Sequence, residues 1–415
     1  MITPFFKLSQ DAENVTVEIR APNANIRDTQ IEFFGRTFCF SSPPYFLRLY
    51  LTGEVRQDDG NTTKYDAENG TFTIQMPKQR TDETFPNLDM LSELIKPQRP
   101  AAGKLVEEID ETEILAEQKI PEEEELTDEK LKEFGYGFGW QRCGVLEKFG
   151  EELNEIFDLT QTGTKIDDRI QELEGKDGDS FSSEHYLADL FDKPPELEEA
   201  LKLKIDPKHF DLNDNDRLQL KDLRITKLGK FTAKETKQIS YSMIDILFAM
   251  VFDLRITDLE HNVCSDQQIG RLAPTLSSLV RYSTAKESIV AAIRRSLCCS
   301  LYRNFDLAKL ATQDVVAILQ RGRCSILHCF LHLRSRFNNS SFDFVYIYNQ
   351  LFIDDYCIWI QSVDDHVLDE LSEEVGVLVK NLKHSDIDGL DLEYIETEGR
   401  MLKLAIENGE YDSDD

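Results

Sequence analysis

A long amphipathic helix is predicted from the stretch TAKETKQISYSMIDILFAM, residues 232–250. Its first four residues are typical of a capping box, in which the side chains of Thr232 and Glu235 bind the first free backbone amides of a helix. Apolar side chains then recur every three or four residues, at Ile239, Met243, Ile246, Leu247 and Met250. Because this spacing gathers them on one face, the stretch predicts a helix that packs into a core.

The chain on both sides of this stretch has the same helical period. The tetrapeptide Thr-Ala-Lys-Glu returns at 284–287 and opens a second predicted helix, with apolar residues at Ile289, Val290, Ile293 and Leu297. The apolar offsets from the two tetrapeptides differ, so they do not mark an internal repeat. Further helical patterns cover roughly 145–157, 183–192, 213–223, 305–320, 323–336, 342–362, 366–382 and 391–406. We therefore predict an all-α domain of about ten helices over residues 134–406.

Before residue 97 the period changes to that of β-strands. Val15, Val17 and Ile19 alternate with polar residues, and Phe38 and Phe40 are spaced in the same way. Gly, Pro and an Asn-Gly pair separate several further short runs of this kind. Residues 1–96 therefore predict an all-β sandwich of about seven short strands, with a short helix near its end. The chain as a whole is predicted to be multidomain.

The acidic charge is concentrated in two stretches. Of the 31 excess negative charges, 22 lie in residues 104–133 and 364–415, whereas residues 134–363 carry 34 acids against 28 bases. We predict an acidic linker without packed structure at 97–133 and an acidic tail at 407–415. The two acidic stretches are expected to lie mostly outside the folded bodies, either as solubilising segments or as segments that attract the basic face of a partner.

Composition argues against several functional classes. A net charge of -31 opposes direct binding to nucleic acid or to an anionic membrane, because phosphate groups are bound by Lys and Arg. The first residues lack a secretory signal pattern, and no apolar run reaches the roughly 18 residues of a membrane span. The eight cysteines include no C-x-x-C pair and are expected to be reduced thiols in a soluble, intracellular protein.

One predicted helix face carries side chains that bind metals. Cys324, His328 and His332 recur every four residues, with Cys329 beside them. Two of them could share a zinc ion, but the outer pair lies roughly 12 Å apart along a helix, so a closed site needs further ligands. They also offer a Cys-His nucleophile pair, although no nucleophile elbow or orienting carboxylate accompanies it. The alternative is a buried, hydrogen-bonded helix face, and we expect no metal, no cofactor and no catalytic residue.

A glycine-rich segment is a first candidate for partner binding. Tyr136, Phe138 and Trp140 alternate with glycines in GYGFGW, residues 135–140. The segment has neither the glycine spacing nor the lysine of a phosphate-binding loop. Its glycines would allow a sharp turn, and its aromatic rings would then either contact a partner or pack onto the helical domain.

A second candidate combines acids with aromatic residues. Its members are Asp354, Asp355, Tyr356 and Trp359. Tyr and Trp are enriched at the centres of interfaces, and the acids suit a basic partner. The alternative is a core tryptophan beside a surface turn. Near the end of the chain, Ser413 is surrounded by acids as kinase sites often are, and an unmodified tail is the alternative.

Eight short segments, spread over essentially the whole chain, carry a family resemblance. They are PYFLRL at 44–49, YDA at 65–67, GTFTI at 70–74, HYLAD at 185–189, YSMIDIL at 241–247, LAPTL at 272–276, LYR at 301–303 and DYCIWIQ at 355–361. Together with the order of β region, acidic linker, FGYGF segment and helical region, they resemble the assembly factor of box H/ACA ribonucleoproteins. Some members of that family have a longer Ser-rich and acidic tail than this chain.

The resemblance implies a chaperone without catalysis. In that family the N-terminal domain is an α-crystallin-like sandwich related to co-chaperone modules. The helical domain binds the RNA-guided, dyskerin-like pseudouridine synthase before guide RNA arrives, and it covers the RNA-binding surface as an RNA mimic. An AAA+ ATPase complex removes the chaperone. The resemblance further implies that the protein is a monomer. It also implies that the protein resides in the nucleus, in the nucleoplasm, and in the cytoplasm.

Two other functions remain as alternatives. A general co-chaperone adaptor would link a heat-shock chaperone to several unrelated clients, whereas the assembly factor would bind one dominant synthase. A cysteine-dependent enzyme or zinc protein would depend on Cys324 and His328.

Overall fold

The computed structural model describes residues 3–21, 29–42, 45–56, 62–66, 70–95, 128–143, 146, 156–158, 164–223, 228–342 and 345–408. The chain divides into two compact units. Unit 1 comprises Met1–Leu126 together with Asn213–Ile225, and unit 2 comprises Thr127–Leu212 together with Thr226–Asp415. Each unit is described by itself below.

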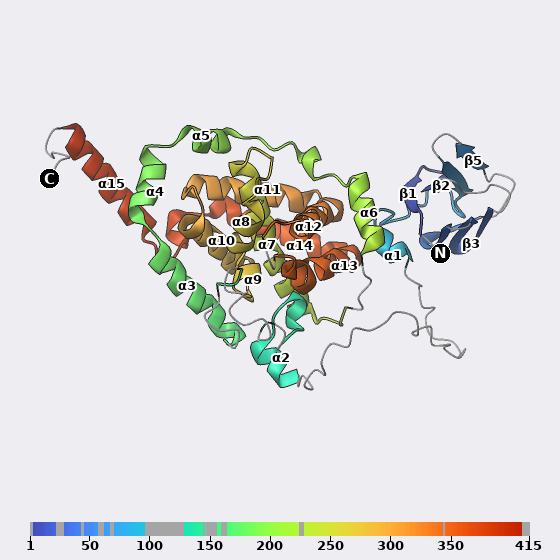
Figure 1. Cartoon of the computed structure of the whole chain (residues 1–415), viewed down its shortest axis with the longest axis horizontal. Coiled ribbons are helices and arrows are strands. Elements are labelled where there is room, and N and C mark those ends of the chain that lie inside the picture. Colours follow the sequence, from blue (N-terminus) through green and yellow to red (C-terminus); the bar gives the residue numbers. More distant parts are fainter. Residues whose placement is uncertain are drawn as a thin grey trace. The chain divides into compact units, whose positions relative to one another are not determined.

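Unit 1 is strand-rich, as predicted (Figure 1). Its strands are β1 (Phe5–Gln10), β2 (Asn14–Arg20), β3 (Gln30–Ser42), β4 (Tyr45–Val55), β5 (Thr62–Asp66) and β6 (Thr71–Pro77). One antiparallel sheet has the order β1-β2-β6-β5, and a second pairs β3 with β4. The sequence predicted about seven strands, whereas the described residues of this region form six, so a seven-stranded sandwich is not confirmed.

The two-residue period of the sequence gives unit 1 its core. Val17 and Ile19 of β2 are fully buried and lie opposite Ile74 and Phe72 of β6. Phe40 of the second sheet meets Phe72 edge to face, with 5.1 Å between the ring centroids. The alternating residues therefore place one apolar face of each sheet in a common core.

Two helices complete unit 1, namely α1 (Leu91–Ile95) and α6 (Asp214–Asp222). They lie against each other, and α6 also contacts β1 (Figure 1). The Ser92 hydroxyl donates a hydrogen bond of 2.9 Å to the backbone oxygen of Leu220, whose side chain is buried. The sequence assigned residues 213–223 to the helical domain, whereas in the structure their packing joins them to unit 1.

Unit 2 is helical, as predicted. Its helices are α2 (Asp128–Phe134), α3 (Arg169–Ser180), α4 (Ser183–Phe191), α5 (Pro195–Lys202), α7 (Ala233–Ile256), α8 (Ser265–Leu272), α9 (Pro274–Ser277), α10 (Ala285–Cys299), α11 (Phe305–Gln320), α12 (Arg323–Asn338), α13 (Asp354–Ser362), α14 (Asp365–Asn381) and α15 (Leu392–Glu407). Single 3-10 turns occur at Phe138–Trp140, Ile166–Asp168, Pro207–Phe210 and His384–Asp386. None of the helices in the described part of the chain is long and apolar enough to cross a membrane.

Helix α7 runs through the middle of unit 2 (Figure 1). The capping box at Thr232 is confirmed, because its hydroxyl accepts from the Glu235 amide and the Glu235 carboxylate accepts from the Thr232 amide. Every residue from 238 to 255 is buried, so the helix packs all round rather than on one face. At the second tetrapeptide, Thr284 caps α10, but the Glu287 carboxylate binds the amide of Ser283 instead of closing a full box.

Three predictions about segments need correction or fall outside the description. The predicted helix at 145–157 lies mainly outside the described residues. The linker predicted to lack packed structure at 97–133 overlaps α2, which begins at Asp128. The helix predicted over 342–362 is interrupted by a π-helical turn at Asn349–Ile353, before α13 begins.

The expectation that the acidic stretch 364–415 lies outside the folded bodies is wrong for most of its length. Helices α14 and α15 occupy much of this stretch, and α14 packs on α11 of the same unit. The apolar side chains of Leu368, Leu371 and Val375 point into that packing and are buried. The predicted tail overlaps the end of α15 at Glu407, and Ser413 lies outside the described residues.

Candidate partner-binding site

The GYGFGW segment forms a tight loop. The Tyr136 amide donates to the Arg142 carbonyl oxygen at 2.8 Å, and the Arg142 amide returns a bond of 3.1 Å to Tyr136. Gly137 and Gly139 have φ angles of 74° and 60°. A Cβ atom on Gly139 would lie 2.4 Å from the Phe231 ring. Glycine is therefore required at Gly139 for both conformation and space.

A buried arginine holds the start of this loop. The Arg169 guanidinium of α3 donates to the backbone oxygens of Phe134 at 2.9 Å, Gly135 at 2.8 Å and Leu279 at 3.0 Å. Arg169 itself is fully buried. Because these carbonyl groups would otherwise lack partners in the interior, the arginine fixes the loop relative to the helices around it.

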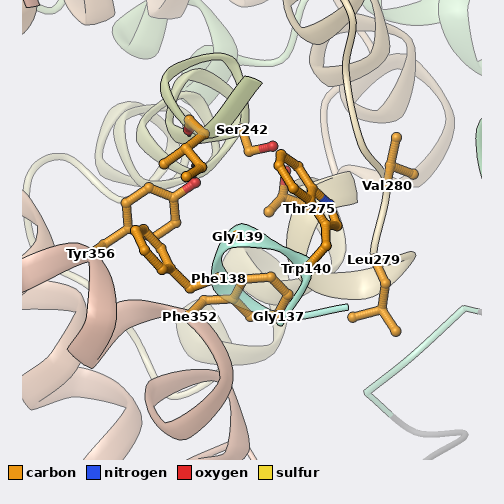
Figure 2. A pocket seen from close by; sticks show the side chains of 11 residues that line it. Gly137, Phe138, Gly139, Trp140, Ser242, Thr275, Leu279, Val280, Phe352 and Tyr356 are labelled. Atoms are coloured by element: carbon orange, nitrogen blue, oxygen red, sulfur yellow. Dashed lines mark hydrogen bonds between the residues drawn. The ribbon is translucent and has the colours of Figure 1, made fainter. Parts of the chain in front are cut away.

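The loop brings the two predicted candidate groups together. The Phe138 ring meets the ring of Tyr356 edge to face at 4.8 Å and that of Trp359 at 6.2 Å. The Tyr356 hydroxyl donates to the Ile239 carbonyl oxygen of α7 at 2.9 Å. Figure 2 shows Phe138 beside Tyr356, with Trp140 on the other side of the small pocket that they line. Residues far apart in sequence thus form one aromatic cluster.

Four of the candidate aromatic side chains are packing residues. Tyr136, Phe138, Tyr356 and Trp359 are each at most 5% exposed. The Phe138 ring packs on Tyr356 and Trp359, and the Tyr136 hydroxyl accepts from the Leu146 amide at 2.9 Å, so the four side chains offer almost no surface to another molecule. The structure thus supports the alternative in which these rings pack onto the helical domain.

The two candidate acids are paired within unit 2. Asp355 lies 2.9 Å from the Arg142 guanidinium, and Asp354 lies 2.7 Å from that of Arg334. Burial raises the pKa of Asp355, and the charge of Arg142 opposes that rise. A basic partner would therefore have to compete with a cation already in place at each carboxylate.

Trp140 is the exception among the aromatic candidates. It is half-buried, and its φ angle of 55° lies in the left-handed region, which bulky residues rarely adopt. The Arg281 guanidinium stands 5.7 Å from the centre of its ring. On its exposed side, Trp140 borders an open groove of about 580 Å³. This groove is the accessible part of the candidate site.

Several residues of the site were not found from the sequence. Phe231 touches Phe138 with 5.6 Å between ring centroids, and its position just before the helix cap Thr232 is where a hydrophobic staple residue often stands. That position could have marked it. Arg142 and Arg169 act on residues distant in the sequence, and no local pattern announces such partners.

The Cys and His face of α12 is partly buried. Cys329 is fully buried and Cys324 is exposed. His332 stacks on His261 with 4.9 Å between ring centroids, and His261 is 2.6 Å from the Asp253 carboxylate. Burial lowers the pKa of His332 to about 3. Within the described ranges, no group of three or more His, Cys, Asp or Glu side chains is arranged to hold a metal ion.

Comparison with known proteins matches both units. Residues 3–95 match the family described as "SHQ1-like, CS domain", and residues 203–390 match "SHQ1 protein, Shq1 domain". A Caenorhabditis elegans protein named "Protein SHQ1 homolog" is 35% identical over an alignment covering 100% of this chain and 99% of that protein. The chain belongs to the SHQ1 family. An SHQ1 homolog of Xenopus tropicalis is 33% identical, over 97% of this chain and 70% of its own length.

The SHQ1 family match agrees with the order of the two regions in the structure. The CS match covers β1 to α1, and the Shq1 match covers the helices from α6 to α14. "Protein shq1" of Schizosaccharomyces pombe is 31% identical over 91% of this chain and 92% of its own length, so the likeness covers most of both proteins. The strand-rich N-terminal region and the helical C-terminal region are therefore shared by family and structure.

Proposed function

We propose that this SHQ1 family member is a non-catalytic assembly chaperone of box H/ACA ribonucleoproteins. It would bind the RNA-free pseudouridine synthase, cover its RNA-binding surface and leave before the mature particle forms. Family membership over both units and the resemblance of the segments quoted above support this role. The strong acidity of the chain supports it too, because a basic RNA-binding surface attracts a polyanion.

The observation that carries the proposal is the acidic face of α14. Its exposed acids are Asp365, Asp369, Glu370, Glu373 and Glu374. Asp365 pairs with Arg323 and Glu370 with Lys237, whereas Asp369 and Glu373 form no ion pair among the described residues. Asp369 and Glu373 stand one turn apart on a folded helix, with the 60% exposed Val377 one turn further on. A row of fixed carboxylates ending in an apolar side chain suits a basic groove better than a flexible tail does, because less conformational freedom is lost on binding.

The test measures binding of the full chain to the RNA-free synthase. We expect affinity to fall between low and high salt, because exposed charges are screened, and guide RNA to displace the chain. Asp369→Lys with Glu373→Lys should weaken binding about tenfold. The matched control, Glu199→Lys with Glu260→Lys, alters two exposed acids elsewhere in unit 2 by the same charge and should change binding little. A complex indifferent to both salt and RNA would exclude RNA mimicry.

The same purification separates this role from the alternatives. One dominant synthase among co-purified proteins supports the assembly chaperone, and many unrelated clients support a general co-chaperone adaptor. Unchanged binding by Cys324→Ala with His328→Ala, together with absence of zinc by metal analysis, supports the non-catalytic role. We further propose removal by an AAA+ ATPase complex and residence in nucleus and cytoplasm. Release on addition of the ATPase with ATP, and imaging of the tagged full chain, test these two points.

A further inference from the structure

The open groove beside Trp140 has a charge opposite to that of the chain. Its walls come from α2, the loop at 139–141, and the start of α7. Lys132, Lys230, Lys234 and Arg281 line it in a chain with a net charge of -31. Such a local reversal of sign attracts an anionic group that the rest of the surface repels.

The two acids in the groove cancel only part of the positive charge of its four cationic side chains. Asp167 pairs with Arg281 at 2.7 Å. The Glu235 carboxylate accepts hydrogen bonds of 2.7 and 2.8 Å from the amide and hydroxyl of Thr232, so it serves the helix cap. Lys132, Lys230 and Lys234 are exposed, and among the described residues none of the three forms an ion pair. Three cationic side chains therefore remain available to a ligand.

The second Thr-Ala-Lys-Glu tetrapeptide shows that this availability does not follow from the local sequence. Lys286 occupies the same place in its helix cap as Lys234 does, and it lies 2.8 Å from the Asp386 carboxylate. That contact raises the pKa of Lys286. The same local sequence thus gives a lysine that is paired with a carboxylate at α10 and, at the groove, an exposed lysine without an ion pair in the described part of the chain.

Trp140 provides a flat apolar surface among these cations. Its left-handed φ of 55° is unfavourable for a tryptophan, and such strain is often kept at ligand-binding positions. The Arg281 guanidinium and the Phe231 side chain border the exposed part of the ring. An apolar side chain could cover the ring while neighbouring carboxylates meet the lysines.

We propose that this groove binds an acidic peptide segment of a partner protein, with Asp or Glu residues on the lysines and one apolar side chain against Trp140. This partner differs from the basic synthase proposed above, because the groove and the acidic face of α14 attract opposite charges. A peptide fits better than nucleic acid, since it can place a few carboxylates on the lysines and one apolar side chain on Trp140, whereas a phosphate backbone repeats its charge along the whole strand and is opposed by the net charge of -31.

The experiment uses the full chain and a fluorescein-labelled peptide with four glutamates on each side of one phenylalanine. We expect binding at least tenfold tighter than that of the same peptide with glutamine in place of glutamate, and weakening as salt rises. Lys230→Glu with Lys234→Glu should weaken binding about tenfold, since each reversal replaces an exposed attraction by a repulsion. Lys208→Glu with Lys380→Glu makes the same change of charge at exposed lysines outside the groove and should leave binding within about twofold.

Tryptophan fluorescence supplies a second readout. The chain has two tryptophans, and Trp359 is buried, so a change in emission on peptide binding is expected to come from Trp140 and to vanish in Trp140→Phe. Equal weakening by both lysine pairs, or tighter binding of a single-stranded oligouridylate than of the peptide, would overturn the proposal. Binding seen only after Glu122, Glu123, Glu124 and Glu125 are replaced by Gln would also overturn it, because the acidic segment of the same chain would then be the occupant.

Discussion

The two sides of the loop at 135–142 differ in what they do with aromatic residues. On the inner side, Phe138 is enclosed by Tyr356, Trp359 and Phe231. On the outer side, two residues later, Trp140 stays half-buried beside a groove with exposed lysines. Composition and spacing do not distinguish the two residues. The difference teaches that an aromatic motif can combine a packing residue and a contact residue, and that only the backbone conformation separates them.

The largest expected effect comes from removing the inner ring. Phe138→Ala should lower the free energy of unfolding by about 3–5 kcal/mol, because it empties a site closed on all sides. Trp140→Ala should cost less, about 1 kcal/mol, since part of its ring is already in water. Urea denaturation followed by tryptophan fluorescence measures the free energy of unfolding of each variant. Trp140 and Trp359 both lie in unit 2, so whichever remains reports on that unit. Equal losses would break the comparison between the two sides.

A second test concerns the buried Asp245 of α7, which binds Thr275, a residue of the small pocket beside Phe138. This carboxylate is fully buried and accepts from the Thr275 amide at 2.7 Å and the Tyr282 hydroxyl at 3.0 Å. Burial raises its pKa to about 7. Between about pH 4 and 7, the carboxyl group of Asp245 is therefore protonated in the native state and ionised in the unfolded state. The stability that this group contributes falls as pH rises through that window.

Asp245→Asn should remove this dependence. Relative to the original chain, we expect the variant to gain about 2 kcal/mol as pH rises from 5 to 7.5. Urea denaturation at the two pH values measures the difference. His332, whose lowered pKa gives the opposite slope, is present in both proteins and cancels in the comparison. An unchanged difference between the two proteins would show that the carboxylate is already ionised without penalty in the fold.

The smallest effect compares the helix caps at the groove and away from it. Thr232→Ala should cost about 1 kcal/mol, because it removes the hydroxyl that accepts from the Glu235 amide and donates to the Glu235 carboxylate, while the backbone amide at 232 keeps its bond to that carboxylate. Thr284→Ala should cost somewhat less, because the Thr284 hydroxyl accepts from the Glu287 amide, and the contacts of the described residues include no bond from it to the Glu287 carboxylate. The same urea titrations measure both. A larger loss at Thr284 would show that the bond from the Thr232 hydroxyl to the Glu235 carboxylate adds nothing to the cap at the groove.

Local patterns predicted much of the fold, and long-range packing explains what they missed. The starts of α7 and α10 follow from Thr-x-x-Glu, and the faces of β2 follow from alternation, because these signals act within a few residues. Helix α6 belongs to unit 1 because it packs on α1, which lies more than a hundred residues away in the sequence. Likewise, the residue types of Tyr136 and Tyr356 suited an interface, but no local pattern showed that the Tyr136 hydroxyl would accept from the Leu146 amide in the interior or that the Phe138 ring would pack on Tyr356.

The partners of the site residues are also far from them in the sequence. Trp140 was predicted as a candidate from its type, yet the cationic side chains around it come from three segments and showed no pattern. Asp354 and Asp355 looked free because their cations, Arg334 and Arg142, lie 20 and 213 residues away in sequence. Charge seen in a sequence therefore predicts attraction only after the internal pairs are known.

Because α6 belongs to unit 1, unit 1 cannot be completed during synthesis until α6 has been made. α1 ends at Ile95, and α6 begins at Asp214. A ribosome that adds about 5–20 residues per second needs roughly 6–24 s to make the interval. Until then Ser92 cannot reach Leu220, and the surfaces of α1 and β1 that α6 covers stay open. The unit whose strands are translated first thus becomes complete only after more than half of the chain has been made.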